Sequence, residues 1–582
     1  MTSSNDSDQA LALALVQQGW SHLQLQRPQA AWAAWQRALR VVPDDPAARE
    51  ALETLESAAE LPAAARTVYR FQRPRDADRR ARWDLAFRGR NLEQLDAAAA
   101  AFADLCAEDP TDAAAAYNEG LCLAWLGRNV EAIGALDRAV RLLAGDDFDR
   151  AVEAWTLAEV LRQGGGAEAL ADDLRYVWVI DGADRDVVTQ LAGRVPLVPA
   201  ATPRNPVIDQ VRTDVEIFEW LDRPLPAGPA ELKEAADLPR LLATVVGTSQ
   251  VLRLSSPDPE SLDEIQDLLI QVVGERAATL RREASPLPLT LLDAALWRFR
   301  FPDWLDREAR QPLTRGAVES SYEDRWIHVP RKGLDGRSPL EAARLAAADV
   351  VVRARLTAVL RLREQLGARP GTAELYQGYP FDRLRRRLGL DPVDPATLDL
   401  EDVSCMSEAE LDALDPAAPE DVRLADAFQS AAGLRQDDRT SRFAAELVRR
   451  NSPSLARLDL ASLFAPLVRQ AMSAQDPGRA IAWLDRARAI ASGSGRRTFD
   501  IWNAEIFART GDPEAALKTY EAVLERTPSD LALAFDAAGT LLDQGYEEYA
   551  RPLLLHARDQ ARLAGDARAA ERAQEILDEV LS

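Results

Sequence analysis

The sequence predicts a mainly α-helical protein, in which two blocks of repeated helical hairpins flank a small α+β region with an antiparallel sheet and a helical middle region. Three observations support this fold class. Small residues recur at a fixed interval in helical stretches near both ends of the chain, and short runs rich in β-branched and aromatic residues lie between them. The composition, 47% hydrophobic and 28% charged, is typical of folded proteins, and 582 residues are too many for one core.

The first block of repeats is clearest in the stretch YNEGLCLAWLGRNVEAIGALDRAV, residues 117–140. Its small residues stand at Gly120, Gly127, Ala132 and Ala139. Two antiparallel helices approach each other closely only where Gly or Ala removes the obstructing side chain, so this spacing predicts a helix, a turn and a second helix. The small residues are therefore expected to have a structural role.

The same unit recurs near the C-terminus, where residues 499–530 and 531–560 superpose at an interval of 34 residues. Four pairs of residues match at this interval: Phe507 with Leu541, Gly511 with Gly545, Ala516 with Ala550, and Tyr520 with Leu554. A fixed interval over four pairs indicates a repeated supersecondary unit.

A period of 34 residues with this order of small and bulky residues resembles the tetratricopeptide repeat, abbreviated TPR. The N-terminal stretch 9–45 has the same order, with Pro43 ending its second helix as Pro528 does in the second block. The resemblance implies two TPR-type α-solenoid blocks, and the first block is expected to end in a weaker hairpin at 147–175 that turns at RQGGGAE. The polar last helix suits the terminal cap that a solenoid requires.

The region between the blocks changes pattern and predicts strands. Four short runs are rich in β-branched and aromatic residues and are bounded by Pro, Gly and Asp: 174–181, 214–221, 240–247 and 250–256. Only Thr248 and Ser249 separate the last two, which predicts a hairpin in an antiparallel sheet. A helix is expected over 258–283, with acidic residues in its first turn and Arg at its end.

Helix patterns return after residue 288 and contain one distinctive element, Trp326–Ala342. Its Trp-x-x-x-Pro and Leu-x-Gly-x-x-Pro-x-Glu-Ala pattern is similar to a helical element of MbcA/ParS/Xre-type antitoxins and of proteins associated with SEC-C motifs. The residues also predict a turn at Gly336 followed by a helix start, with Ser338 and Glu341 as a capping box.

These patterns predict five parts. They are N-terminal TPR-like repeats (1–175), a small α+β domain (176–287), a helical domain with the Trp326–Ala342 element (288–390), an Asp/Pro-rich bridge with one helix near 419–434 (391–455), and C-terminal TPR repeats with a capping helix (456–582).

Composition excludes several classes of function. The net charge of −24 repels phosphate backbones, so nucleic acid is not expected as a partner. Three cysteines without a CxxC pair indicate a reducing compartment. Because the N-terminus lacks the basic region of a signal peptide and no long uncharged apolar run occurs, we expect a cytoplasmic protein without membrane attachment. The predominance of Arg over Lys, together with abundant Ala, is typical of high-GC bacterial coding.

Residues that could carry chemistry are few and scattered, so no catalytic, cofactor-binding or metal-binding residues are predicted. The chain has three His, and His22 and His556 fall inside repeat helices. An enzyme would have to use His328, Asp181 or Cys405 of the middle part of the chain. The Gly run at 163–168 lacks the Lys-Ser/Thr of a phosphate loop. A basic cluster at 383–387 suits either a solvated helix face or a contact with acidic groups.

What remains is recognition, because a helical-hairpin array presents its first helices on one face. The repeat register places nine residues on such faces as predicted contacts for a protein or peptide partner: Trp20, Gln24, Tyr117, Leu121, Trp125, Glu505, Arg509, Phe535 and Asp543. The best-known peptide-binding members use Lys, Arg and Asn there to hold a C-terminal carboxylate. The aromatic, aliphatic and acidic residues of this chain favour an apolar or basic peptide, or a protein surface.

The function expected from the sequence is thus a non-enzymatic adaptor or scaffold that binds a protein or peptide in the grooves of its repeats. Two alternatives stay open. One is a regulatory protein that binds a small partner through the middle domain and the Trp326–Ala342 element. The other is an enzyme of unknown type centred on the middle domain.

Overall fold

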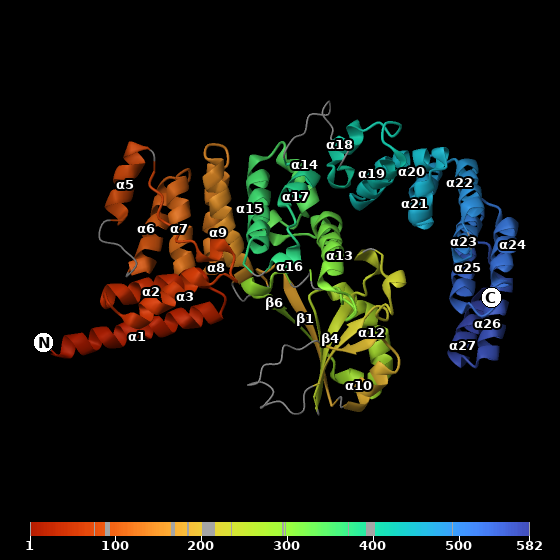
Figure 1. Cartoon of the computed structure of the whole chain (residues 1–582), viewed down its shortest axis with the longest axis horizontal. Coiled ribbons are helices and arrows are strands. Elements are labelled where there is room, and N and C mark those ends of the chain that lie inside the picture. The colour runs from red at the N-terminus through yellow and green to blue at the C-terminus, as the bar shows by residue number, and fades with distance from the viewer. Residues whose placement is uncertain are drawn as a thin grey trace. The chain divides into compact units, whose positions relative to one another are not determined.

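The computed structural model separates into two compact units, Met1–Leu390 and Asp391–Ser582 (Figure 1), and each is described by itself. The structure describes residues 2–74, 76–87, 94–164, 169–182, 185–200, 216–233, 235–248, 250–293, 296, 298–370, 372–390, 402–491 and 493–580. Helices dominate both units, and the strands belong to the first unit.

The N-terminal part of the first unit is helical. Its helices are α1 (Thr2–Gln24), α2 (Pro28–Val41), α3 (Pro46–Ser57), α4 (Ala63–Arg66), α5 (Ala77–Phe87), α6 (Leu95–Glu108), α7 (Ala113–Trp125), α8 (Asn129–Leu143) and α9 (Phe148–Gly164). Consecutive helices pack as hairpins, most extensively α1 with α2 and α7 with α8.

Small residues make these hairpins possible, as the sequence pattern predicts. A Cβ at Gly19 of α1 would lie 2.1 Å from the indole nitrogen of Trp35 in α2. A Cβ at Gly120 of α7 would lie 2.8 Å from Leu136 Cγ in α8. Gly127 has φ +74° and forms the left-handed turn between α7 and α8.

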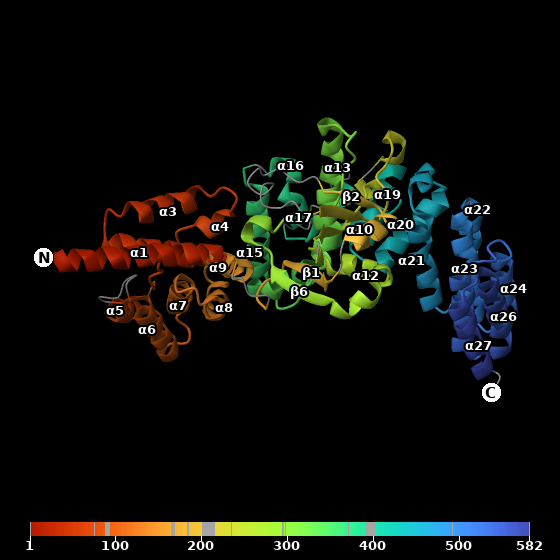
Figure 2. The same ribbon diagram turned by 90° about the horizontal axis from the view of Figure 1, so that it is seen from below.

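The last helix of this array finds its partner elsewhere in the sequence. The hairpin expected at 147–175 is wrong, because the chain after α9 leads into strand β1 (Leu174–Asp181) and not into a second helix. The turn expected for this hairpin lies largely outside the described residues. Instead α9 packs against α15 (Val350–Gly367), and the two helices lie side by side in Figures 1 and 2. Helix α15 thus occupies the place that a second repeat helix would take.

The middle of the first unit is a six-stranded antiparallel sheet in the order β2-β3-β4-β5-β1-β6. Besides β1, its strands are β2 (Leu197–Pro199), β3 (Glu216–Leu221), β4 (Leu241–Gly247), β5 (Val251–Ser256) and β6 (Arg281–Pro286). The four predicted runs all contain strands, and β4 and β5 form the predicted hairpin. Apolar side chains of α10 (Arg185–Ala192) and α12 (Pro259–Val273) form a core with the sheet.

The helix expected over 258–283 is wrong in its second half. Helix α12 ends at Val273, because Gly274 takes φ +59°, and a 3₁₀ segment, Gly274–Thr279, follows. The polar segment Arg281–Pro286 then pairs with the free edge of β1. Its side chains have no strand-like alternation of apolar and polar residues, so its extended conformation is determined by backbone pairing with β1.

The remaining helices of the first unit surround the Trp326–Ala342 element. They are α13 (Arg307–Ser320), α14 (Pro339–Ala346), α15, α16 (Ala373–Tyr376) and α17 (Phe381–Arg387). The predicted capping box is present, with Ser338 and Glu341 each bonded to the other's backbone amide, and Gly336 has φ +77°. The element packs on α9, where the Trp155 indole donates a hydrogen bond to the Gly333 carbonyl oxygen at 3.1 Å.

The second unit is a run of helical pairs. Its helices are α18 (Glu408–Ala413), α19 (Asp421–Gly433), α20 (Asp437–Arg450), α21 (Leu460–Ser473), α22 (Pro477–Ile490), α23 (Ser494–Arg509), α24 (Pro513–Leu524), α25 (Leu531–Asp543), α26 (Glu547–Ala564) and α27 (Ala567–Val580). Each of α19, α21, α23 and α25 packs on the helix that follows it, and α26 packs on α27.

One of these pairs was not expected from the sequence. The bridge predicted with one helix near 419–434 contains α19 at that place, but α20 follows it directly and buries Phe443, Leu447 and Val448. Helical pairing therefore begins before residue 456. The five-part domain division itself stays a prediction.

Candidate peptide-binding face

The predicted contact residues of α1 are open to solvent. Trp20 is 37% exposed and packs edge-on against Trp35, with ring centroids 5.1 Å apart. Gln24, one turn further on, is exposed. Both side chains are accessible to a partner.

The predicted contact residues of α7 are instead covered by the chain itself. Tyr117 and Leu121 have no exposed surface, and Trp125 is 5% exposed. The cover includes the segment Thr67–Pro74, which follows α4 and has no helix or strand assignment. We call this the cover segment; its sequence is TVYRFQRP.

The cover segment is held on α7 by a side-chain amide. The Asn118 carboxamide oxygen accepts a hydrogen bond from the Gln72 backbone N–H at 2.7 Å, and its NH₂ group donates to the Gln72 carbonyl oxygen at 2.7 Å. Asn118 is fully buried. A side-chain amide that satisfies both backbone groups of one residue holds an extended chain irrespective of that residue's side chain.

An aromatic subsite lies next to this clamp. The Phe71 ring is 5.2 Å from Trp125 in an edge-on arrangement and 5.6 Å from Phe102 of α6. Trp32 of α2 lies 5.5 Å from Trp125. Three helices thus build one aromatic site, and the cover segment fills it with Phe71.

Hydrogen bonds also fix the N-terminal end of the cover segment. Gln29 of α2 donates to the Thr67 carbonyl oxygen at 3.2 Å, and the Tyr69 hydroxyl donates to the Ala64 carbonyl oxygen at 3.2 Å. The Tyr69 pKa is raised by burial and by the nearby Glu153, so the phenol stays protonated.

The predicted contacts of the second unit are partly accessible. Arg509 and Asp543 are exposed, at the ends of α23 and α25. Glu505 is half-buried, and burial raises its pKa against the opposing effect of Arg509. Phe535 is half-buried, with the Arg572 guanidinium 5.0 Å from its ring centroid.

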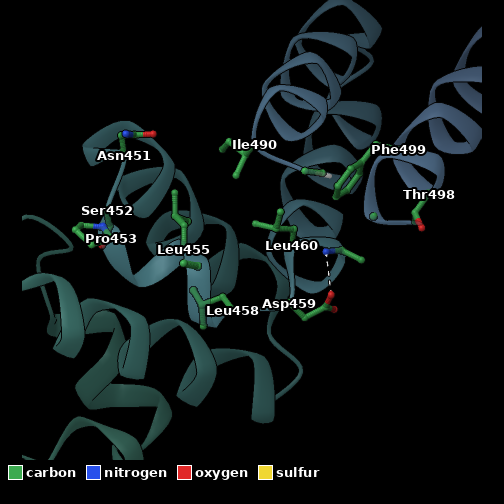
Figure 3. Close-up of a pocket in the computed structure, with 14 residues that line it drawn as sticks. Asn451, Ser452, Pro453, Leu455, Leu458, Asp459, Leu460, Ile490, Thr498 and Phe499 are labelled. Atoms are coloured by element: carbon green, nitrogen blue, oxygen red, sulfur yellow. Dashed lines mark hydrogen bonds between the residues drawn. The ribbon is translucent and has the colours of Figure 1, made fainter. Parts of the chain in front are cut away.

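The second unit also has a pocket that the sequence did not indicate. It has a volume of about 730 Å³ and lies between the segment 451–461 and the residues that join α22 to α23 (Figure 3). Leu455, Leu458, Ile490 and Phe499 give it apolar walls, and Asp459 lies on its rim with its carboxylate bonded to the amides that begin α21. The two sides of the pocket are about 40 residues apart in the sequence, and no periodic pattern connects them.

The three residues considered for an enzyme belong to three different elements, two in the first unit and one in the second. Asp181 ends β1 and forms an ion pair with Arg281. His328 belongs to the short 3₁₀ turn Trp326–His328. Cys405 is buried in the second unit. No group of three or more potential metal ligands occurs among the described residues.

The other cysteines are poor nucleophiles. Burial, with a further contribution from Glu119, raises the Cys106 pKa to about 12 and raises the Cys122 pKa further.

The basic cluster of α17 makes contacts within its own unit. Arg383 donates to the buried Glu323 at 3.0 Å, and Arg385 donates to Glu364 at 2.7 Å. Arg387 is 1% exposed. The cluster is therefore no open surface for an acidic partner.

The Trp326–Ala342 element is likewise held by ion pairs within its own unit. Arg331 donates to Asp173 at 3.0 Å, and Arg363 of α15 forms an ion pair with the same carboxylate. Burial opposes ionisation of Asp173, but these two guanidinium groups hold its pKa below the ordinary value. The turn of the element is therefore part of the core that joins α9 to α15.

Comparison with known proteins gives no family. No family model matches the chain, and no curated protein matches it. No helix in the described residues is long and apolar enough to span a bilayer.

Several solved structures resemble the chain weakly. Yeast Tom70 is 12% identical with a TM-score of 0.22, covering 97% of this chain and 95% of that one. The APC/C hetero-tetramer Cut9-Hcn1 is 11% identical with a TM-score of 0.19, covering 97% and 86%. The P58(IPK) TPR domain is 12% identical with a TM-score of 0.17, covering 86% and 99%. Scores this low do not establish a common fold, so the helical-hairpin architecture rests on the helix pairs of this chain.

Proposed function

We propose that this chain is a TPR-type, non-enzymatic adaptor that binds an extended peptide or a protein surface on the faces of its helical hairpins. The observation that carries the proposal is the clamp between Asn118 and the backbone of Gln72. Through such a clamp a helix face can hold an extended peptide. In this structure the cover segment of the protein itself occupies the clamp.

The nine predicted contact residues divide into two groups under this proposal. Tyr117, Leu121 and Trp125 build the face of α7 that the cover segment occupies. The other six contacts belong to surfaces that a partner would meet without displacing the cover segment: Trp20, Gln24, Glu505, Arg509, Phe535 and Asp543. Trp20 is the strongest anchor among them, because a half-exposed indole offers a large contact area at a small loss of conformational entropy.

Charge and cysteine chemistry support the class of partner and the location. A net charge of −24 favours a basic partner over an acidic one. Three cysteines, none of them in a disulfide, suit a cytoplasmic protein. The two alternative functions have less support. The Trp326–Ala342 element is engaged with α9 and α15, and the enzyme candidate Asp181 is ion-paired with Arg281.

Affinity capture with the tagged full chain tests the adaptor function. The variants are Trp20→Ala with Gln24→Ala in the first unit, and Arg509→Ala with Asp543→Ala in the second. Exposed residues of the same helix or of the following helix pair provide matched controls, Leu13→Ala on α1 and Arg551→Ala on α26. Substitution of the exposed residues Gln24, Arg509 and Asp543 changes stability by less than about 0.5 kcal/mol. Trp20 also packs against Trp35, so thermal unfolding must confirm that its variant is folded before lost binding is assigned to the contact.

The expected result is one partner retained by the intact chain and by both controls and lost from one of the double variants. A partner that every variant retains equally would contradict these contact assignments. Direct binding of the purified partner to the purified chain is required in either case.

A further inference from the structure

We propose that residues Thr67–Pro74 are an internal pseudo-ligand of the α7 face, and that a partner displaces them with an extended segment that carries two aromatic residues at i and i+2, with one basic residue between them and a second basic residue after them. The inference rests on the proposed function and specifies both its partner and its regulation.

The cover segment has the side-chain distribution of a bound peptide. Tyr69 is buried and Phe71 is half-buried, whereas the intervening Arg70 and the following Arg73 are exposed. In an extended chain residues i and i+2 point to the same side, so Tyr69 and Phe71 face the helices and Arg70 faces solvent. The Arg73 guanidinium lies 5.2 Å from the Trp83 ring centroid and pairs with Asp84. A partner with the same alternation would present the same groups to the same face.

Each inward-pointing group meets a built receptor. The Phe71 ring lies against Trp125 and Phe102, and the Gln72 backbone lies on Asn118. The receptor residues come from α6 and α7, which are positioned by their own hairpin packing on Leu136 and its neighbours. The receptor therefore does not depend on the cover segment for its helices.

The match between cover segment and receptor is incomplete. The indole N–H groups of Trp32 and Trp125 are buried and have no acceptor among the described residues. Buried donors without acceptors weaken the assembly that contains them. A partner that places a carbonyl or carboxylate oxygen near these indoles would satisfy them, which gives it an advantage over the cover segment.

The intramolecular segment has the advantage of proximity. A tethered ligand acts at an effective concentration of the order of millimolar, so it excludes weak competitors from the face. The apparent affinity of an outside peptide is reduced by the small fraction of molecules in which the face is open. Only a partner with better complementarity, or one anchored at a second place such as Trp20, gains access.

A peptide titration tests this competition. The probe is a fluorescein-labelled peptide of residues 67–74, TVYRFQRP, and the full-length chain is titrated against it by fluorescence anisotropy. Gln72→Pro removes the backbone N–H that Asn118 accepts, while Gln72→Ala keeps it and is the matched control. Phe71→Ala empties the aromatic subsite and leaves every backbone donor in place.

The proposal predicts that Gln72→Pro and Phe71→Ala bind the probe at least about tenfold more tightly than the intact chain and the Gln72→Ala variant, because the face is open more often. Adding Asn118→Ala to Phe71→Ala should remove that gain. Because two independent variants open the face, a folding failure of one leaves the other as the test, with circular dichroism as the check.

Equal affinity of the intact chain and both opened variants, or absence of binding to all of them, would overturn the pseudo-ligand. The proposed function fails separately, when no purified cellular partner binds the chain. If the opened variants bind the probe but no such partner is found, the pseudo-ligand proposal is still supported. If a partner is lost only from the Arg509→Ala, Asp543→Ala variant, the adaptor function is still supported.

Discussion

The indole N–H of Trp155 donates a 3.1 Å hydrogen bond to the carbonyl oxygen of Gly333, a residue 178 positions later in the chain. This bond joins the N-terminal helical array to the Trp326–Ala342 element. It makes the last array helix, α9, part of the same core as α15, so the array and the helical middle region depend on each other for stability.

Gly333→Ala should destabilise the first unit. A Cβ at this position would lie 2.1 Å from Glu159 Oε1, and Glu159 is buried beside Arg162 and cannot move into solvent. Displacing the Glu159 carboxylate breaks its ion pair with Arg162, and we expect a loss of about 1–3 kcal/mol in the free energy of unfolding, the range for overpacking a core. Denaturant unfolding measures this loss, with Gly336→Ala as the comparison. A Cβ added at Gly336 would meet open space, so that substitution costs only the backbone strain of an alanine at φ +77°. A larger loss at Gly336 than at Gly333 would contradict the packing of the element on α9.

Glu159 should make stability depend on pH. Burial raises its pKa to about 6 from the ordinary value of 4.5, against the opposing effect of Arg162. The folded state therefore holds this proton more tightly than the unfolded state, so the Glu159 contribution to stability is fully present below pH 4.5 and is lost as the pH rises to about 6.

Glu159→Gln removes this titration. The free energy of unfolding of the variant minus that of the native chain should rise by about 2 kcal/mol in total from about pH 3 to about pH 8, from about 1.4 kcal/mol for each unit of pKa. Parallel urea unfolding of both proteins across this range measures the difference. A difference that stays constant with pH would mean that folding leaves the pKa of Glu159 unchanged.

Two glycines of one hairpin should respond to alanine in opposite directions. Gly120→Ala places a Cβ 2.8 Å from Leu136 Cγ and should cost about 1–3 kcal/mol. Gly134, in the interior of α8, has open space around its Cβ, so Gly134→Ala should stabilise by about 0.5–1 kcal/mol through helix propensity. Thermal unfolding of both variants distinguishes them, and equal shifts would show that α7 and α8 do not pack through Gly120.

Cys106 and Cys122 should resist thiol reagents in the native protein. Their raised pKa values leave almost no thiolate at pH 8, and Cys405 is buried in the second unit. Mass spectrometry after brief treatment with a maleimide should find the native chain largely unlabelled and the urea-unfolded chain labelled at all three cysteines. Rapid native labelling of Cys122 would show that α7 is more exposed than the structure describes.

The sequence is sufficient to predict structure where the pattern is confined to residues close together in the chain. Gly19 and Gly120 indicate close helix packing because each has its bulky partner in the next helix. The segments that form β4 and β5 predict a hairpin because only three residues separate the two strands. The capping box of Ser338 is likewise confined to four residues.

Contacts between distant segments leave no such pattern. The pairing of α9 with α15 joins residues about 200 positions apart, and β6 is a strand because an edge of β1 is free to pair with it. The repeat register predicts Tyr117, Leu121 and Trp125 of α7 as partner contacts, but nothing in the composition of residues 67–74 indicates that they cover this helix. Asn118 was missed because a single polar residue on a helix carries no periodic signal.

Hydrogen exchange of the full-length native chain, with and without a saturating excess of the unlabelled TVYRFQRP peptide, tests the central claim most directly. If the cover segment is a displaceable ligand of the α7 face, the backbone amides of Tyr69 to Gln72 should exchange at least about tenfold faster when the peptide is bound, while the amides of α8 keep their protection. Peptide bound at saturation with unchanged exchange at those amides would show that the cover segment is a permanent part of the core and that partners bind elsewhere.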